Sequence, residues 1–192
     1  VMPLGLVNML QATFDEAGIS VKTDFEPFDT IWQDRPALSE ASVFELDVTF
    51  AGASRAEKIA RRRDEMRKHK AEYYLVTALD DIAWLLNLRG RDIECNPVFI
   101  SYVLFSPEKV YLFIDKNKVD ASLTDKLQSD NIFIKDYEAI HHYVAEINAE
   151  SSILISPASI SYGLYQQIKC RDIIQKDSPI MLAKSIKNKL EQ

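Results

Sequence analysis

The stretch that decides the fold is residues 99–114, which read FISYVLFSPEKVYLFI. Two runs of β-branched, aromatic and aliphatic residues, 99–105 and 110–114, lie on either side of a Ser-Pro-Glu-Lys tetrapeptide at 106–109. Serine and proline favour turns, and a short turn between two β-rich runs is typical of a hairpin. The sequence therefore predicts an antiparallel pair of strands in the middle of the chain.

Outward from this hairpin, predicted strands and helices alternate. The apolar spacing predicts helices over residues 55–70, 79–88, 121–128, 137–148, 161–168 and 179–190, and strands over residues 72–77, 132–134, 152–155 and 172–175. Alternation of this kind is typical of a sheet that is largely parallel, and the hairpin adds antiparallel strands. We therefore expect an α/β fold, a mixed β-sheet flanked by helices on both faces.

The first 53 residues follow a different pattern. Helical spacing covers residues 6–17 and ends at Gly18, whereas residues 24–53 have little periodicity but contain Trp32 and several other apolar residues. We interpret residues 24–53 as a linker that packs on a surface through aromatic anchors. The expected organisation is an N-terminal helix and linker over 1–53 and an α/β domain over 54–192, and both ends look cut from a longer protein.

The helix at 55–70 begins with a capping-box pattern, Ser54 followed by Glu57. Ile59, Ala60 and Met66 are its candidate buried residues. The three arginines at 61–63 are surrounded by acidic residues, so we interpret them as a solvated helix face.

Composition excludes several functional classes. The 192 residues carry 23 Lys and Arg against 29 Asp and Glu, a formal net charge of −6, which argues against a nucleic-acid or anionic-membrane surface. No apolar run approaches the roughly 18–20 residues that span a bilayer. The two cysteines form no zinc-type spacing and no disulfide framework, so the expected location is the reducing cytoplasm.

Candidate catalytic and metal-binding residues are few. His141 and His142 are adjacent on a predicted helix and point about 100° apart, so they are poor co-ligands, and His142 with Glu146 is a two-ligand pair without a third. Asp80 and Asp81 follow Leu79 at a predicted helix start, where acidic residues stabilise the helix dipole. We therefore expect no catalytic residue and no metal ligand in this chain.

Two further residues have simple structural interpretations. Cys95 has acidic neighbours, which disfavour a reactive thiolate. Trp84 lies at helical spacing among leucines, which is typical of a core residue.

The most distinctive polar segment is the loop over residues 87–97, NLRGRDIECNP, which joins a helix to a buried strand. Two interpretations stay open: a solvated connection, or a docking edge that faces another domain. For the second, the candidate interdomain residues are Arg89, Arg91, Asp92 and Asn96. Arg89 and Asp92 would pair across that interface or with each other.

At this loop the sequence resembles a known family. VTALDDIAWLLNLRG at 76–90, NPVFISY at 96–102 and LFID at 112–115 are similar to the middle, creatinase-like domain of the long, three-domain Xaa-Pro aminopeptidases (aminopeptidase P). IWQDRP at 31–36 resembles that family's segment leading into the middle domain. AKSIKN at 183–188 resembles the stretch just before its catalytic domain.

The resemblance implies the non-catalytic middle domain of a metal-dependent enzyme that removes the N-terminal residue from peptides with proline second. It also implies that two divalent metal ions, expected to be manganese, bind in a separate catalytic domain. The implied partners are the flanking domains of the same chain and, for the whole protein, the peptide substrate and a second copy. Two alternatives remain: a stand-alone creatinase-N-type binding module without peptidase activity, and an unrelated small enzyme.

Overall fold

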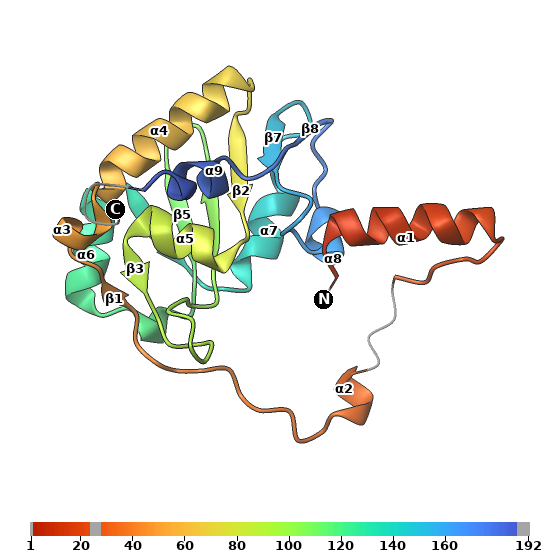
Figure 1. Ribbon diagram of the computed structural model, residues 1–192, viewed down its shortest axis with the longest axis horizontal. Coiled ribbons are helices and arrows are strands. Elements are labelled where there is room, and N and C mark those ends of the chain that lie inside the picture. Colours follow the sequence, from red (N-terminus) through yellow and green to blue (C-terminus); the bar gives the residue numbers. More distant parts are fainter. Residues whose placement is uncertain (1, 24–27, 188–192) are drawn as a thin grey trace.

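The computed structural model describes residues 2–23 and 28–187. The predicted fold class is confirmed: a six-stranded mixed sheet lies between two layers of helices (Figure 1). Its strands are β2 (Tyr73–Val76), β4 (Tyr102–Phe105), β5 (Val110–Phe113), β6 (Ile132–Lys135), β7 (Ser152–Ile155) and β8 (Asp172–Gln175). They lie in the order β6-β5-β4-β2-β7-β8.

The predicted hairpin, β4 with β5, lies inside this sheet between β6 and β2. β4 and β5 pair antiparallel, with Tyr102 opposite Phe113 and Phe105 opposite Val110. β2 pairs antiparallel with β4, whereas β2 with β7, β7 with β8 and β5 with β6 are parallel. The strands at 152–155 and 172–175 have the predicted bounds, and each contains adjacent β-branched or aliphatic residues, SILI and DIIQ.

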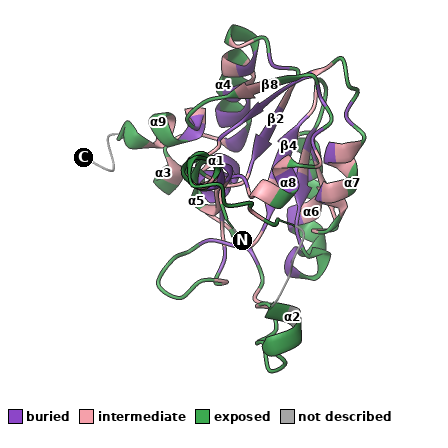
Figure 2. Ribbon diagram, turned by 90° about the vertical axis from the view of Figure 1, so that its right-hand side faces the viewer, coloured by how far each residue is buried: buried purple, intermediate pink, exposed green. Residues whose placement is uncertain are grey.

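Alternate residues of the strands supply two cores. One core packs the sheet against α4 (Arg55–Lys68), α5 (Leu79–Leu86), α6 (Ala121–Ser129) and α9 (Pro179–Ser185). The other packs it against α7 (Ala139–Ala145), α8 (Tyr162–Tyr165) and the start of α1 (Leu4–Glu16). Figure 2 shows the central strands in the colour of buried residues, as expected for a sheet covered on both faces.

The capping box at the start of α4 is confirmed, since the Ser54 and Glu57 side chains each accept a hydrogen bond from the other residue's backbone. The burial of Ile59 and Met66 is also confirmed. Two interpretations were wrong: Ala60 is exposed, and Arg62, 6% exposed, is buried. Arg55, Lys58 and Arg62 share the inner face of the helix with Ile59 because their aliphatic stems can be buried while their charged ends find partners.

The N-terminal segment runs around the outside of the domain (Figure 1). Only the first two turns of α1 are held, through buried Leu4 and Val7 and through hydrogen bonds from Leu4 N to Ile160 O and Gly5 N to Pro157 O, both 2.9 Å. Gly18 follows α1 in the left-handed region, φ +69°, as expected of a glycine just after a helix. From there the chain passes α2 (Phe28–Ile31) to β1 (Phe44–Glu45) and α3 (Val48–Ala51).

Among the described residues, the aromatic side chains expected to anchor this linker do not pack on this domain, and Phe25 lies outside the described residues. Trp32 is 48% exposed and Phe50 is 69% exposed, and Phe28 and Phe44 are exposed as well. The linker is instead held by backbone pairing: β1 lies antiparallel to β3 (Leu88–Arg89), and buried Val43 donates its backbone N–H to Lys118 O at 2.8 Å. The division of the chain between residues 53 and 54 stays a prediction.

Within the residues that the structure describes, no helix is both long and apolar enough to cross a membrane. The final helix, predicted over 179–190, is observed as α9, and residues 188–190 lie outside the described residues.

Candidate functional site

The loop at 87–97 begins at a helix end that the sequence favours. Asn87 terminates α5 in the left-handed conformation, φ 52°, which asparagine tolerates better than most residues. Its side chain is buried: Oδ1 accepts from Lys58 Nζ at 2.6 Å, and Nδ2 donates to Ala53 O at 2.9 Å. The loop therefore leaves α5 in a direction fixed by contacts to α4 and to Ala53 just before it.

Arg89 and Asp92 do not pair with each other. Arg89 Nη1 donates to the backbone oxygens of Ala83 and Leu88, both at 2.8 Å, and burial lowers the pKa of its guanidinium. The Asp92 side chain is 0% exposed; its Oδ2 accepts the Ile100 N–H at 2.7 Å and forms an ion pair with Lys118 of η1 (Lys116–Lys118). Arg89 and Asp92 thus organise the loop from within, and of the two pairings that the sequence left open, the mutual one is not formed, because each residue has an interior partner.

The tip of the loop faces outward. Asn96 N donates to Ile93 O at 3.2 Å, closing a tight turn in which Cys95 adopts φ 60°. Arg91 and Asn96 are exposed, as are Ile93 and Cys95. Of the four predicted interdomain residues, Arg91 and Asn96 are therefore the two whose exposure fits direct contact with another surface.

A surface hollow of about 460 Å³ lies between this loop, α5 and α9. Its lining combines apolar and charged side chains, namely those of Asp80, Ala83, Trp84, Arg89, Asn96, Pro97, Val98, Met181, Lys184, Ser185 and Lys187. The hollow brings the predicted residues Arg89 and Asn96 together with α9, which lies roughly 90 residues further along the chain. Sequence spacing alone could not place α9 beside the loop.

Asp80 and Asp81 both lie in the first turn of α5, as predicted, but their carboxylates are not independent. Lys184 Nζ of α9 donates to Asp80 Oδ2 and, at 2.6 Å, to Asp81 Oδ1. Burial raises the pKa of the Asp80 carboxyl, but the hydrogen bond and charge of Lys184 outweigh it and the net pKa is lowered. The two acids therefore form an ion-pair site shared with one lysine, which sequence reasoning did not predict.

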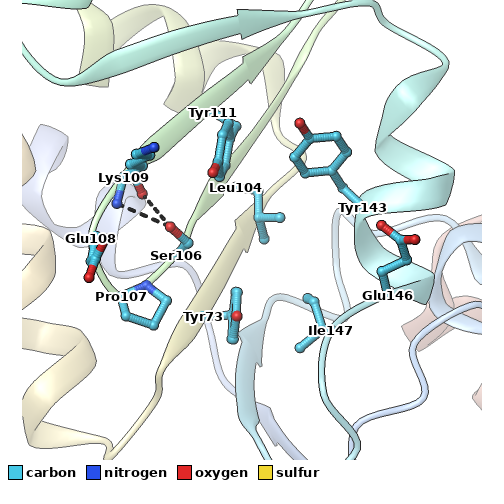
Figure 3. Close-up of a pocket in the computed structure, with 10 residues that line it drawn as sticks. All are labelled: Tyr73, Leu104, Ser106, Pro107, Glu108, Lys109, Tyr111, Tyr143, Glu146 and Ile147. Atoms are coloured by element: carbon cyan, nitrogen blue, oxygen red, sulfur yellow. Dashed lines mark hydrogen bonds between the residues drawn. The ribbon is translucent and has the colours of Figure 1, made fainter.

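A second hollow, of about 390 Å³, lies on the face that carries α7 (Figure 3). Tyr73, Tyr111 and Tyr143 line it with Leu104, Pro107 and Ile147, and so do the charged residues Glu108, Lys109 and Glu146. Lys135 Nζ lies 5.9 Å and 5.6 Å from the ring centroids of Tyr111 and Tyr143, so two nearby lysines offset the two glutamates. The hollow offers aromatic surface without a dominant charge.

The histidines do not converge on a metal site. His141 Nδ1 bonds Gln167 Oε1 at 2.9 Å, whereas His142 Nε2 lies 3.1 Å from Glu146 Oε2 on the exposed side of α7. Among the described residues, no group of three or more His, Cys, Asp or Glu side chains could hold a metal ion. The described part of the chain therefore does not fit the dinuclear metal centre that the resemblance implies for the whole protein.

Comparisons with known proteins agree with the resemblance. Residues 34–191 match the family model of the Creatinase/Prolidase N-terminal domain. The probable Xaa-Pro aminopeptidase P of Laccaria bicolor is 41% identical over 176 residues, which cover 85% of this chain and 26% of that protein. Xaa-Pro aminopeptidase 1 of Dictyostelium discoideum is 39% identical over 183 residues, covering 93% of this chain and 28% of that protein.

A solved structure shows the same fold. The X-prolyl aminopeptidase of Caenorhabditis elegans, described as a cytosolic enzyme with a di-nuclear active site, superposes with a TM-score of 0.89 and 26% identity. The superposition covers 97% of this chain and 32% of that one, so the chain spans about a quarter to a third of the proteins it matches. The chain belongs to the Creatinase/Prolidase N-terminal domain family and matches that domain of Xaa-Pro aminopeptidases.

Proposed function

We propose that this chain is the non-catalytic middle domain of a Xaa-Pro aminopeptidase, an enzyme that removes the N-terminal residue from peptides with proline second. One observation carries the proposal: most of this chain aligns with proteins named Xaa-Pro aminopeptidase and covers about a quarter of the length of each. The described residues, by contrast, bring together no metal-ligating cluster. The chemistry then belongs to a part of the protein outside this domain, where two divalent metal ions, expected to be manganese, would activate the water that attacks the peptide.

The domain's own contribution is scaffolding of the substrate cleft and docking of the flanking domains. The candidate docking edge is the loop of Arg89, Arg91, Asp92 and Asn96. Asp92 and Arg89 hold the loop through buried contacts, which leaves Arg91 and Asn96 exposed at its tip. Loops held by a rigid framework are where proteins place their contact residues, and this loop fits that pattern.

The whole protein is proposed to be cytoplasmic and to act as a homodimer. The description of the Caenorhabditis elegans relative as cytosolic supports the location. The exposed apolar residues of the linker and of α9, among them Phe50 and Leu182, leave surface for contacts with other domains or with a second copy.

Variants of the loop tip in the longer protein test the docking role. Arg91→Glu and Asn96→Ala should lower cleavage of an Arg-Pro-Pro peptide, because they change the contact surface without removing a buried interaction. Arg171→Glu, an equal charge reversal at an exposed residue just before β8, is the matched control. Unchanged cleavage in both loop variants would remove the loop from the docking surface.

A further inference from the structure

A buried polar cluster joins α5 to α9, and the docking loop does not take part in it. Asp81 of α5 is 1% exposed, and its Oδ2 accepts a hydrogen bond from Ser178 Oγ at 2.5 Å. Ser178, also buried, lies 3.3 Å from the hydroxyl of Tyr74 on β2. Residues of β2 and α5, which follow each other in the sequence, thus meet at a serine that lies 104 residues after Tyr74 and 97 residues after Asp81.

The protons of this cluster can be assigned. A carboxylate only accepts, so the single hydroxyl proton of Ser178 goes to Asp81. Tyr74 must then donate to Ser178 Oγ, and burial raises the pKa of the Tyr74 phenol, so that proton is retained at neutral pH. The N–H groups of Ile180 and Met181 share the second lone pair of Ser178 Oγ, at 3.3 and 3.4 Å, so Ser178 caps α9.

Helix α9 depends on these contacts. It has seven residues, fewer than an isolated helix needs to be stable in water. Two long side chains hold it in addition: Lys184 bonds Asp80 and Asp81, and Arg62 Nη1 of α4 donates to Pro179 O at 2.5 Å. Ile180 is completely buried beneath it. The inner side of α9 is therefore held at three positions: the N-cap Ser178, the first residue Pro179, and Lys184 near the end of the helix.

The outer side of α9 has the opposite character. Met181 and Leu182 are 48% and 63% exposed, and Ile186, the extended residue just after the helix, is 79% exposed. Met181 lines the 460 Å³ hollow together with Trp84 and Pro97, beside the loop tip. Hydrogen bonds and an ion pair hold the inner side of this helix in place. The exposed apolar side is therefore presented in a single orientation.

We propose that Asp81 is a positioning residue, which fixes α9 so that its outer face docks against the catalytic domain in the productive orientation. The inference rests on the proposed function and on the resemblance of residues 183–188 to the stretch just before the family's catalytic domain. Asp81 acts through α9 and does not touch substrate. Exposed Asp80, which contacts the same lysine but not Ser178, is not needed for this role.

The test compares variants in the longer protein. Asp81→Asn keeps the side-chain size but removes the charge that accepts from Ser178 and Lys184, and Asp80→Asn is the matched control. For Asp81→Asn, we expect amide exchange at residues 182–186 to rise about tenfold or more while that of β4 and β5 is unchanged. We also expect kcat to fall about tenfold, with KM and metal content less affected, because a small misplacement of domains disturbs the aligned reactants.

Further variants separate positioning from loss of stability. Val144→Ala removes buried methyl groups under α7, so it should destabilise the domain without changing α9 exchange or kcat. Lys184→Met should reproduce part of the Asp81→Asn effect, and Lys184→Arg, which restores the cation, should reverse it. If Asp81→Asn does not fold, Ser178→Ala removes the same hydrogen bond without leaving a buried amide.

The outcomes distinguish the inference from the proposed function. Faster exchange in α9 with unchanged kcat would overturn the positioning role and leave the proposed function intact. An equal fall in kcat for Val144→Ala would overturn it too, since general destabilisation would then explain the effect. Absence of Xaa-Pro cleavage in the unaltered longer protein would contradict the proposed function itself.

Discussion

The carboxylate of Asp92 and the ammonium of Lys118 form an ion pair whose side chains are 0% and 3% exposed. The pair ties the loop after β3 to η1, and Lys118 O also accepts the N–H of Val43 from the linker. Three separate segments therefore meet at one buried interaction.

Asp92→Ala should destabilise this chain by about 3–5 kcal/mol, because it leaves the Lys118 charge buried without its partner. Urea unfolding followed by far-UV circular dichroism measures this, with Arg91→Ala as the exposed control, expected within about 0.5 kcal/mol of the unaltered chain. A double variant, Asp92→Leu with Lys118→Met, should recover much of the loss. A cost below about 1 kcal/mol for Asp92→Ala would mean that the pair is not buried in solution.

Gly90 makes a close approach that no other residue type fits. A Cβ at this position would lie 2.6 Å from the Cβ of Phe99 and 2.9 Å from Val98 O. Gly90→Ala should therefore cost about 1–3 kcal/mol, as overpacking of a tight core does.

Gly163 is the matched control for that substitution. A Cβ there would meet nothing within 4 Å, so Gly163→Ala should be neutral or stabilise α8 by about 0.5–1 kcal/mol. Thermal unfolding of both variants checks the pair of expectations. Equal effects at the two positions would contradict the packing of Gly90 against residues 98 and 99.

Arg62 and Arg61 are neighbours with opposite environments. Arg62 is buried and donates to Pro179 O, whereas Arg61 is exposed. Arg62→Ala should cost about 2 kcal/mol through lost packing and a lost charged hydrogen bond, and Arg61→Ala should stay within about 0.5 kcal/mol. Chemical denaturation measures the loss of unfolding free energy in each variant. Similar losses for Arg62→Ala and Arg61→Ala would show that Arg62, like Arg61, is solvated.

The Lys184 ion pairs predict a pH dependence. Burial opposes the charged form of Lys184, yet its hydrogen bonds to Asp80 and Asp81 raise its net pKa, and the pKa of Asp80 is lowered. The contribution of Asp80 is lost as pH falls through its folded pKa, and that of Lys184 is lost as pH rises through its own.

The difference in unfolding free energy between the unaltered chain and Lys184→Met should therefore be largest from about pH 5 to pH 9. It should shrink below about pH 4 and above about pH 10.5. Urea unfolding across this range measures it, and a difference that stays constant would show that the ion pairs contribute nothing to stability.

The sequence predicted the elements whose signals are local. The hairpin, the strand at 152–155 and the capping box at Ser54 each depend on residues a few positions apart. The inner face of α4 was also encoded locally, since Arg55, Ile59, Arg62 and Met66 follow helical spacing. The acidic neighbours of the arginine run favour a solvated face, whereas the helical spacing of Arg62 with Ile59 and Met66 agrees with its burial.

The candidate site was predictable only in part. The loop at 87–97 was singled out by its polar residues and its family resemblance, but the partner of Asp92 lies 26 residues away and that of Asp81 lies 97 residues away. Such pairs depend on the order of the strands in the sheet, which brings α9 beside α5. The spacing of residues along the sequence does not determine that order. The contacts of Lys184 and Ser178 with Asp81 could therefore be identified only from the structure.

The most direct measurement is hydrolysis of an Arg-Pro-Pro peptide in the presence of manganese, by this chain and by the same chain extended through its natural downstream sequence. The account predicts release of the N-terminal arginine by the extended protein and none by the 192-residue chain. Hydrolysis by the 192-residue chain alone would contradict the central claim and would place the chemistry among its own residues.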